Sequence, residues 1–166
     1  MTRREFETQF RRLYLPLGMY ALRITGDTGE AEDIVQEAFI RAWERVSEGG
    51  EIADFKPFMY MSVRNGCLSL LRGRRETVGL ETMPEPTAEA VDTSERDARV
   101  WRAIGALPER CREIFLMSKR DGLSNDEIAS ELGISLQTVK NQMSKAFARL
   151  RDELSDGGKP FFLPFL

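Results

Sequence analysis

The sequence predicts an all-α protein of two small helical domains joined by a flexible acidic linker. Apolar residues recur at helical spacing in both halves, and no stretch alternates apolar and polar residues as a strand does. Residues 76–98 hold two prolines, seven acidic residues and no sustained apolar period, which is typical of a linker. The predicted organisation is therefore a domain at 1–75, a linker at 76–98, a domain at 99–154 and an apolar tail at 155–166.

The first half predicts three helices. The first runs from Phe6 to Ile24, and Pro16 is expected to kink or split it. The second begins after Asp27, which forms a capping box with Glu30. Its apolar side chains repeat as one buried face: Ala31, Ile34, Val35, Ala38, Phe39, Ala42, Trp43 and Val46. The third spans about residues 57–75 and packs inward through Phe58, Met61, Leu68 and Leu71.

The second half predicts a short helix, a longer one and a helix-turn-helix. The short helix buries Val100, Trp101, Ile104 and Leu107. Pro108 suits the first position of the next, which ends near Gly122 and packs through Cys111, Ile114, Phe115 and Ser118. In "LSNDEIASELGISLQTVKNQMSKAFARLRDEL", Ser124 and Glu127 form a second capping box, Gly133 makes the turn and Ser135 caps the last helix.

The last helix has an apolar face and a polar face. The inward residues are Val139, Met143, Ala146, Phe147, Leu150 and Leu154. The outward residues near its N-terminus combine cations with short hydrogen-bonding groups, as base edges and phosphates require: Gln137, Thr138, Lys140, Asn141, Ser144 and Lys145. A merely solvated face is the alternative, but the turn, the caps and the absence of acids from 136–151 favour DNA binding.

The charge is unevenly distributed, although the net charge is only -3. Residues 56–75 contain five basic side chains and no acid, and residues 136–151 contain four and none. Two basic stripes therefore flank the acidic segment. The first stripe mixes cations with Phe55, Phe58 and Tyr60, a combination that suits unpaired bases, although aromatic residues at helical spacing are more often core.

The composition excludes several functions. The chain has no histidine, which rules out a Cys/His zinc site, a Ser/His/Asp triad and a Cys/His dyad. We therefore expect no enzyme, metal, cofactor or small-molecule substrate. Cys67 and Cys111 are predicted to be buried, reduced thiols. No apolar run is long enough to span a bilayer and the N-terminus does not resemble a secretory signal, so a cytoplasmic location without membrane insertion is expected.

Three collinear motifs resemble a known family. "AEDIVQEAFIRAWE", "RNGCLSLLRGRR" and "LPERCREIFLMSKRDGLSNDEIASELGISLQTVKNQMSKAFARLR" are similar to extracytoplasmic-function (ECF) sigma factors of the sigma-70 family, with the flavour of the Bacteroidetes branch. The resemblance implies a bacterial transcription initiation factor with sigma-2 and sigma-4 domains. It also implies binding to core RNA polymerase, through the β′ clamp helices and the β flap, and to promoter DNA, with an anti-sigma factor as a further expected partner.

The resemblance assigns residues to three surfaces. It implies a core-polymerase surface on the second helix, comprising Asp33, Gln36, Glu37, Ile40 and Arg41. The minus-10 element would contact Lys56, Tyr60, Arg64, Asn65, Ser69, Arg72, Arg74 and Arg75. The minus-35 element would contact Ser135, Gln137, Thr138, Lys140, Asn141, Ser144 and Lys145.

Some features depart from the family or stay open. Ser69 stands where the family often has Asp, and Gly66 and Gly73 interrupt a segment that usually forms helix better, each at a cost of about 1 kcal/mol relative to Ala. A sigma-like decoy for an anti-sigma factor and a stand-alone helix-turn-helix regulator are the alternative functions. The tail "SDGGKPFFLPFL" has three open interpretations: a disordered end, a strap on the second domain, or a contact for another protein.

Overall fold

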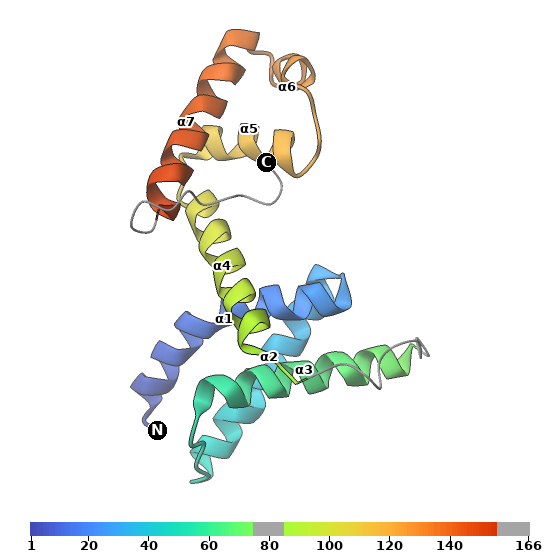
Figure 1. Cartoon of the computed structure of the whole chain (residues 1–166), viewed down its shortest axis with the longest axis vertical. Coiled ribbons are helices and arrows are strands. Elements are labelled where there is room, and N and C mark those ends of the chain that lie inside the picture. The colour runs from blue at the N-terminus through green and yellow to red at the C-terminus, as the bar shows by residue number, and fades with distance from the viewer. Residues whose placement is uncertain (75–84, 156–166) are drawn as a thin grey trace. The chain divides into compact units, whose positions relative to one another are not determined.

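The computed structural model describes residues 1–74 and 85–155, which form seven helices and, within those ranges, no strand (Figure 1). The helices are α1 (Arg3–Thr25), α2 (Thr28–Ser47), α3 (Phe55–Gly73), α4 (Ala88–Gly105), α5 (Glu109–Lys119), α6 (Asn125–Leu132) and α7 (Leu136–Leu154). The chain divides into two compact units, here called unit 1 (Met1–Ala98) and unit 2, which begins at Arg99. The all-α prediction is confirmed.

Helix α1 is longer than predicted and is not split. It begins at Arg3 because Thr2 and Glu5 form a capping box that the prediction had omitted, and it ends at Gly26, whose φ of 72° is left-handed. The helix continues through Pro16, which is buried. Apolar packing of α1 onto its neighbours compensates for the hydrogen bond that this proline cannot donate.

Helix α2 is capped as predicted at Asp27, whose carboxylate accepts a 2.9 Å hydrogen bond from the Glu30 amide. The reciprocal half of the capping box is absent, because the Glu30 carboxylate pairs instead with Arg74, the residue that follows α3. Five of the eight predicted inward residues are buried, namely Ala31, Val35, Ala38, Phe39 and Ala42. Trp43 lies at the edge of this face and is 38% exposed, so its predicted burial is wrong.

Helix α3 packs closely on α2 at Gly66. A β-carbon at Gly66 would lie 2.8 Å from Cγ2 of Ile34, so only glycine permits this approach without a shift. The helix runs through Gly66 and ends at Gly73. Leu68 and Leu71 are buried as predicted, whereas Phe58 and Met61 are only half-buried because Phe55, Met59 and Val63 occupy the inner face.

The predicted linker is not a linker throughout, because helix α4 begins at Ala88 and residues 88–98 belong to unit 1. Ala90 and Val91 pack against the unit 1 core, and Ser94 and Ala98 are fully buried. Small side chains make this inner face, so it carries little of the apolar period that marks a helix in a sequence. Residues 75–84, the rest of the predicted linker together with Arg75, lie outside the described residues.

Unit 2 follows the prediction closely. The final turns of α4 bury Val100 and Ile104 as predicted, but Trp101 is 38% exposed. Pro108 is the N-cap of α5, one position before its predicted place, and Cys111, Ile114 and Phe115 of that helix are buried. The tail beyond Ser155 lies outside the described residues.

Candidate nucleic-acid interfaces

Helices α6 and α7 form a tightly specified helix-turn-helix (Figure 1). Ser124 and Glu127 make the predicted capping box, and Gly133 ends α6 at a left-handed φ of 64°. The Ser135 hydroxyl then caps α7 by accepting a 3.1 Å hydrogen bond from the Thr138 amide. These local contacts fix where α7 begins and therefore which of its side chains turn outward.

The apolar face of α7 is anchored in the unit 2 core. Val139, Met143, Ala146 and Leu150 are buried, and Phe147 meets Phe115 edge-to-face at 5.8 Å between ring centroids. The Cys111 thiol of α5 donates to the Gln142 carbonyl at 3.4 Å. Burial raises the pKa of this thiol, which keeps it protonated and unreactive.

The opposite face of α7 is open to solvent. Every residue predicted to contact the minus-35 element is exposed: Ser135, Gln137, Thr138, Lys140, Asn141, Ser144 and Lys145. The Gln137 amide donates to the Asn141 side-chain oxygen at 3.0 Å, and the Ser135 and Thr138 hydroxyls lie 2.8 Å apart. The face thus presents ordered amide and hydroxyl groups of the kind that bind base edges.

The cations of this face are available to an anion. Neither Lys140 nor Lys145 forms an ion pair within the described part of the chain. The first turn of α7 contains no acidic residue, so the positive end of the helix dipole reinforces these charges. The arrangement suits a phosphate backbone.

Helix α3 presents its predicted minus-10 residues on two different faces. Lys56 and Tyr60, one helical turn apart, contact residues of α4. Asn65, Ser69 and Arg72 lie on another face and are exposed. Arg64 is half-buried and donates to the Asn65 side-chain oxygen at 3.2 Å, and Arg74 pairs with Glu30. The structure therefore does not bring the predicted set together.

Tyr60 is a correction to the predicted site. Its side chain is 1% exposed and its hydroxyl lies 2.6 Å from that of Ser94, so it presents no surface to a base in this conformation. Burial raises the pKa of Tyr60 to about 12. Aromatic residues at helical spacing are more often core than surfaces for bases, and Tyr60 is a core residue of unit 1.

The exposed face of α2 carries all five residues predicted to bind core polymerase: Asp33, Gln36, Glu37, Ile40 and Arg41. Arg41 and Glu37 form an ion pair of 2.9 Å, and the Gln36 amide lies 3.4 Å from the Tyr14 hydroxyl. Ile40 is 53% exposed, which is unusual for a side chain of this size and polarity. The α2 face is therefore polar, with one apolar residue at its centre.

A groove of about 600 Å³ joins the α2 face to the open face of α3. Asp33, Glu37 and Arg41 line one side, and Asn65 and Ser69 line the other. The groove also includes Ser62, which the sequence analysis omitted although it lies two turns before Ser69 on the same face. Residues assigned to two separate partners thus border a single depression.

The described residues contain no group of three or more Cys, Asp or Glu side chains that could hold a metal ion. Among those residues, no helix is long and apolar enough to cross a membrane. Cys67 and Cys111 are free and buried, as predicted.

Comparison with known proteins identifies the class. Residues 10–77 match the model for sigma-70 region 2, and residues 97–150 match the model for sigma-70 region 4. The chain is thus a sigma-70 family protein, a non-enzymatic transcription initiation factor of the kind that binds core RNA polymerase and promoter DNA. Its sequence relatives define a narrower group within this family, and the chain belongs to the ECF sigma factors.

Curated relatives support this placement. The chain is 32% identical to the ECF RNA polymerase sigma factor SigL of Mycobacterium tuberculosis, over 86% of this chain and 84% of the relative. It is 34% identical to the probable RNA polymerase sigma factor RfaY of Xanthomonas campestris, over 81% of this chain but only 36% of that longer relative. Neither relative tests the resemblance of the motifs to the Bacteroidetes branch, which stays a prediction.

A solved structure also matches. The sigma factor RpoE of Bartonella quintana, in complex with the anti-sigma factor NepR, is 23% identical. The match covers 90% of this chain and 96% of that chain with a TM-score of 0.37. Family membership therefore rests on the sequence relatives and on the two family models.

Proposed function

We propose that this ECF sigma factor directs promoter-specific transcription through three separate surfaces. The α2 face, with Asp33, Gln36, Glu37, Ile40 and Arg41, binds the β′ clamp helices of core polymerase. The open face of α3 holds the non-template strand of the minus-10 element. The outward face of α7 enters the major groove of the minus-35 element, and unit 2 also contacts the β flap.

The observation that carries this proposal is the outward face of α7, since all seven predicted residues are exposed on a helix whose start is fixed by Gly133 and Ser135. Amide groups at Gln137 and Asn141 match the paired donor and acceptor of adenine in the major groove. Lys140 and Lys145 supply the charge that neutralises phosphates and makes binding dependent on salt.

Asn65, Ser69 and Arg72 support the minus-10 role. All three are exposed on one face of α3, and they combine a cation with hydrogen-bonding groups. The segment from Phe55 to Gly73 contains no acid, so nothing on α3 itself repels a strand. We exclude Tyr60 from the surface available in the free chain because it is buried.

Two further parts of the proposal concern regulation and place. An anti-sigma factor is expected to hold the chain inactive by covering the α2 face, where Ile40 is exposed. The cytoplasm is the proposed location, because transcription takes place there. Ile40→Glu would weaken a partner that buries this side chain while leaving the core of unit 1 intact.

Run-off transcription with purified core polymerase tests the function. A sigma factor yields transcripts from defined start sites, whereas a decoy binds core weakly or not at all and yields none. A stand-alone regulator binds duplex DNA without core. Promoters for the assay come from sequencing the 5′ ends of transcripts after overproduction of the chain. Absence of promoter-specific transcripts from an assembled holoenzyme would refute the proposal.

A further inference from the structure

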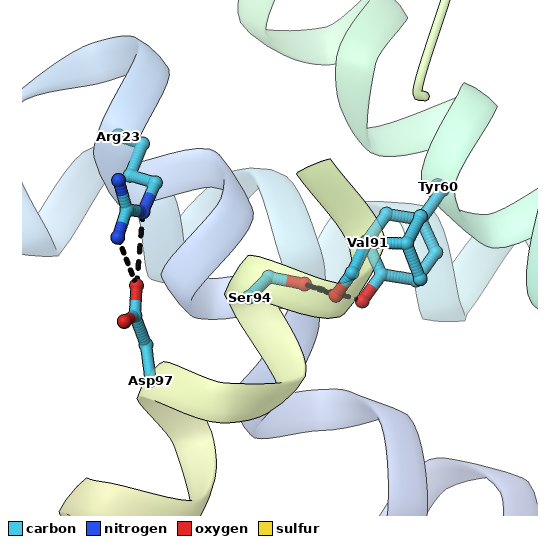
Figure 2. Close-up of polar contacts among 5 residues, drawn as sticks. All are labelled: Arg23, Tyr60, Val91, Ser94 and Asp97. Carbon is cyan, nitrogen blue, oxygen red and sulfur yellow. Dashed lines mark hydrogen bonds and ion pairs between the residues drawn. The ribbon is translucent and has the colours of Figure 1, made fainter. Parts of the chain in front are cut away.

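The first part of α4, residues 88–98, is docked on α1 and α3 within unit 1 by three polar contacts, two of which Figure 2 shows. Ser94 contacts Tyr60 of α3, Asp97 pairs with Arg23 of α1, and Glu95 pairs with Lys56 of α3. Ala90 and Val91 add apolar packing. We call this segment the α4 latch.

The buried contact is a directed chain of hydrogen bonds. The Ser94 hydroxyl has one proton, which it donates to the Val91 carbonyl at 2.8 Å. The Tyr60 hydroxyl therefore donates to the Ser94 oxygen, at 2.6 Å (Figure 2). Ser94 is fully buried, and its oxygen is the acceptor that the latch offers to this phenol. Removing that oxygen leaves a buried donor unsatisfied.

The two ion pairs place carboxylates on cations. A Glu95 oxygen lies 2.5 Å from Nζ of Lys56, and one Asp97 oxygen accepts from both Nε and Nη2 of Arg23, at 2.9 and 2.7 Å. Carboxylate and phosphate oxygens bind the same lysine and arginine donors, so a donor held by one is not available to the other. The latch therefore imitates the backbone of a strand at Lys56.

The latch and a DNA strand compete for the same residues. Lys56 and Tyr60 form a stripe along α3, and the resemblance assigns both to the minus-10 element. The latch pairs with Lys56 through Glu95 and binds the Tyr60 hydroxyl through Ser94, while the Tyr60 ring also packs on Tyr20 of α1. The exposed stripe of Asn65, Ser69 and Arg72 is left uncovered. Only part of the single-strand surface is consequently closed in this state.

We propose that the α4 latch competes with the minus-10 strand for Lys56 and Tyr60. The latch must detach from unit 1 before these two residues can contact DNA. This inference rests on the proposed function of α3. Release frees the Lys56 ammonium and the Tyr60 hydroxyl, groups that suit the phosphate and the base of an unpaired nucleotide. The free chain thus has lower affinity for single-stranded DNA than its residues alone provide.

The contact is built to be reversible. Both ion pairs are partly exposed to solvent, and pairs of this kind contribute little net stability. An open cleft of about 360 Å³ between α1 and the start of α4, lined by Tyr20, Ile24 and Ala90, leaves the packing incomplete. The Tyr60–Ser94 bond is the single fully buried polar contact of the latch among the described residues.

The test measures binding of the full-length chain to the labelled non-template minus-10 strand of a mapped promoter. Glu95→Gln frees Lys56, and we expect affinity to rise about twofold to fivefold, the range of a partly exposed ion pair. Asp92→Asn is the matched control: it removes the same charge from an exposed position of α4 that forms no ion pair among the described residues. Affinity should be unchanged, and an equal rise would overturn the proposal.

Ser94→Ala provides a test without a change of charge. It leaves the Tyr60 donor without its acceptor, so we expect affinity to rise about fivefold and amide exchange of residues 88–98 to accelerate in the free chain. Adding Lys56→Ala to Ser94→Ala should cancel the gain. Unchanged affinity and unchanged exchange in Ser94→Ala would refute the latch.

The two proposals fail in distinguishable ways. If the parent holoenzyme gives no promoter-specific transcripts, the function assigned to the chain fails. If it transcribes normally but residues 88–98 remain docked on unit 1 in the promoter complex, with amide exchange as slow as in the free chain, only the latch proposal fails. In the supporting outcome, exchange of that segment accelerates when the promoter complex forms.

Discussion

The helices α3 and α7 carry the two surfaces proposed to contact DNA, and they differ in how far their predicted residues are exposed. On α7 every predicted residue is exposed. On α3 the predicted residues divide between an open face and a face that α4 covers, and Tyr60 is buried. Both helices have a clear apolar pattern, so the difference does not arise from the pattern.

The difference arises from the range of the contacts. The α7 face is set by residues three or four positions apart, such as Ser135 with Thr138 and Gln137 with Asn141. The covered face of α3 is set by a contact 34 residues away, between Tyr60 and Ser94. An apolar period shows which face of a helix meets its own core, but it does not show which polar face a distant segment will cover.

The largest expected effect is on holoenzyme assembly, and it tests the α2 face, which lies on neither α3 nor α7. Asp33→Arg reverses a charge at the edge of the groove, and we expect holoenzyme assembly to weaken about tenfold or more, as for charges central to an interface. Competition for core polymerase measures it. Glu32→Arg makes the same charge change at an exposed neighbour on α2 and should assemble normally. Normal assembly by Asp33→Arg would contradict the clamp contact.

The next effect tests α7. Lys140→Ala together with Asn141→Ala removes one charge and one base-reading amide, so promoter binding by holoenzyme should fall about tenfold while core binding is unchanged. The dependence of log affinity on log salt should also decrease by about one unit. Arg151→Ala, in the last turn of α7, is the control. Equal losses of promoter binding and core binding would refute separate roles.

Alkaline pH should lower the stability of unit 1. Burial raises the pKa of Tyr60 from 10.0 to about 12 and that of Cys67 from 9.0 to about 11. Both groups lose their protons at lower pH in the unfolded chain, so their contribution to the stability of unit 1 is complete below pH 9 and is lost as pH rises toward 12. Tyr60 alone accounts for about 2 kcal/mol of this loss.

Urea unfolding at a series of pH values measures this loss. Tyr60→Phe has no ionisable phenol, so its stability should fall less steeply than that of the parent between pH 10 and 12. The slopes are compared and not the absolute stabilities, because this variant also loses the hydrogen bond to Ser94. Parallel curves for the parent and Tyr60→Phe would show that the phenol is not buried in solution.

The smallest effect concerns Gly66, which the sequence marked as a weak point of α3. Ala at this position gains helix propensity of about 1 kcal/mol but overpacks against Ile34 by about 1–3 kcal/mol, so we expect net destabilisation of about 1 kcal/mol. Gly18→Ala, inside α1 with no atom within 4 Å of the added carbon, should stabilise instead. Thermal unfolding measures both, and stabilisation by both would contradict the close approach of α3 to α2.

Local signals predicted most of the fold. Asp27, Ser124 and Ser135 were identified as caps because a short polar side chain just before an apolar period can accept a hydrogen bond from a free backbone amide of the first turn. All three cap their helices in this way. The start of α4 was missed because its inner face is built from Ala90, Ser94 and Ala98, which bury little apolar area. Trp43 and Trp101 were predicted inside because they fit the apolar spacing of their helices, yet each is 38% exposed.

The candidate sites on α2 and α7 could be predicted from local patterns, whereas the site on α3 could be predicted only in part. The predicted α2 and α7 residues are all exposed, because a complete apolar face leaves only one direction for them. For α3, Lys56 and Arg74 are held by Glu95 and Glu30, acids from other helices whose positions the spacing within α3 cannot show. The residue assignments themselves remain proposals on all three helices.

The central claim is that two separate surfaces bind two elements of one promoter. Footprinting of the holoenzyme on a mapped promoter tests it most directly, with permanganate to detect unpaired thymines and DNase I to detect protected duplex. We predict reactive thymines in the minus-10 region and a protected minus-35 region with the parent chain. With Lys140→Ala and Asn141→Ala, protection of the minus-35 region should be lost, while the pattern of melted bases in the complexes that still form is unchanged. Melting at a promoter without minus-35 protection in the parent would contradict the account.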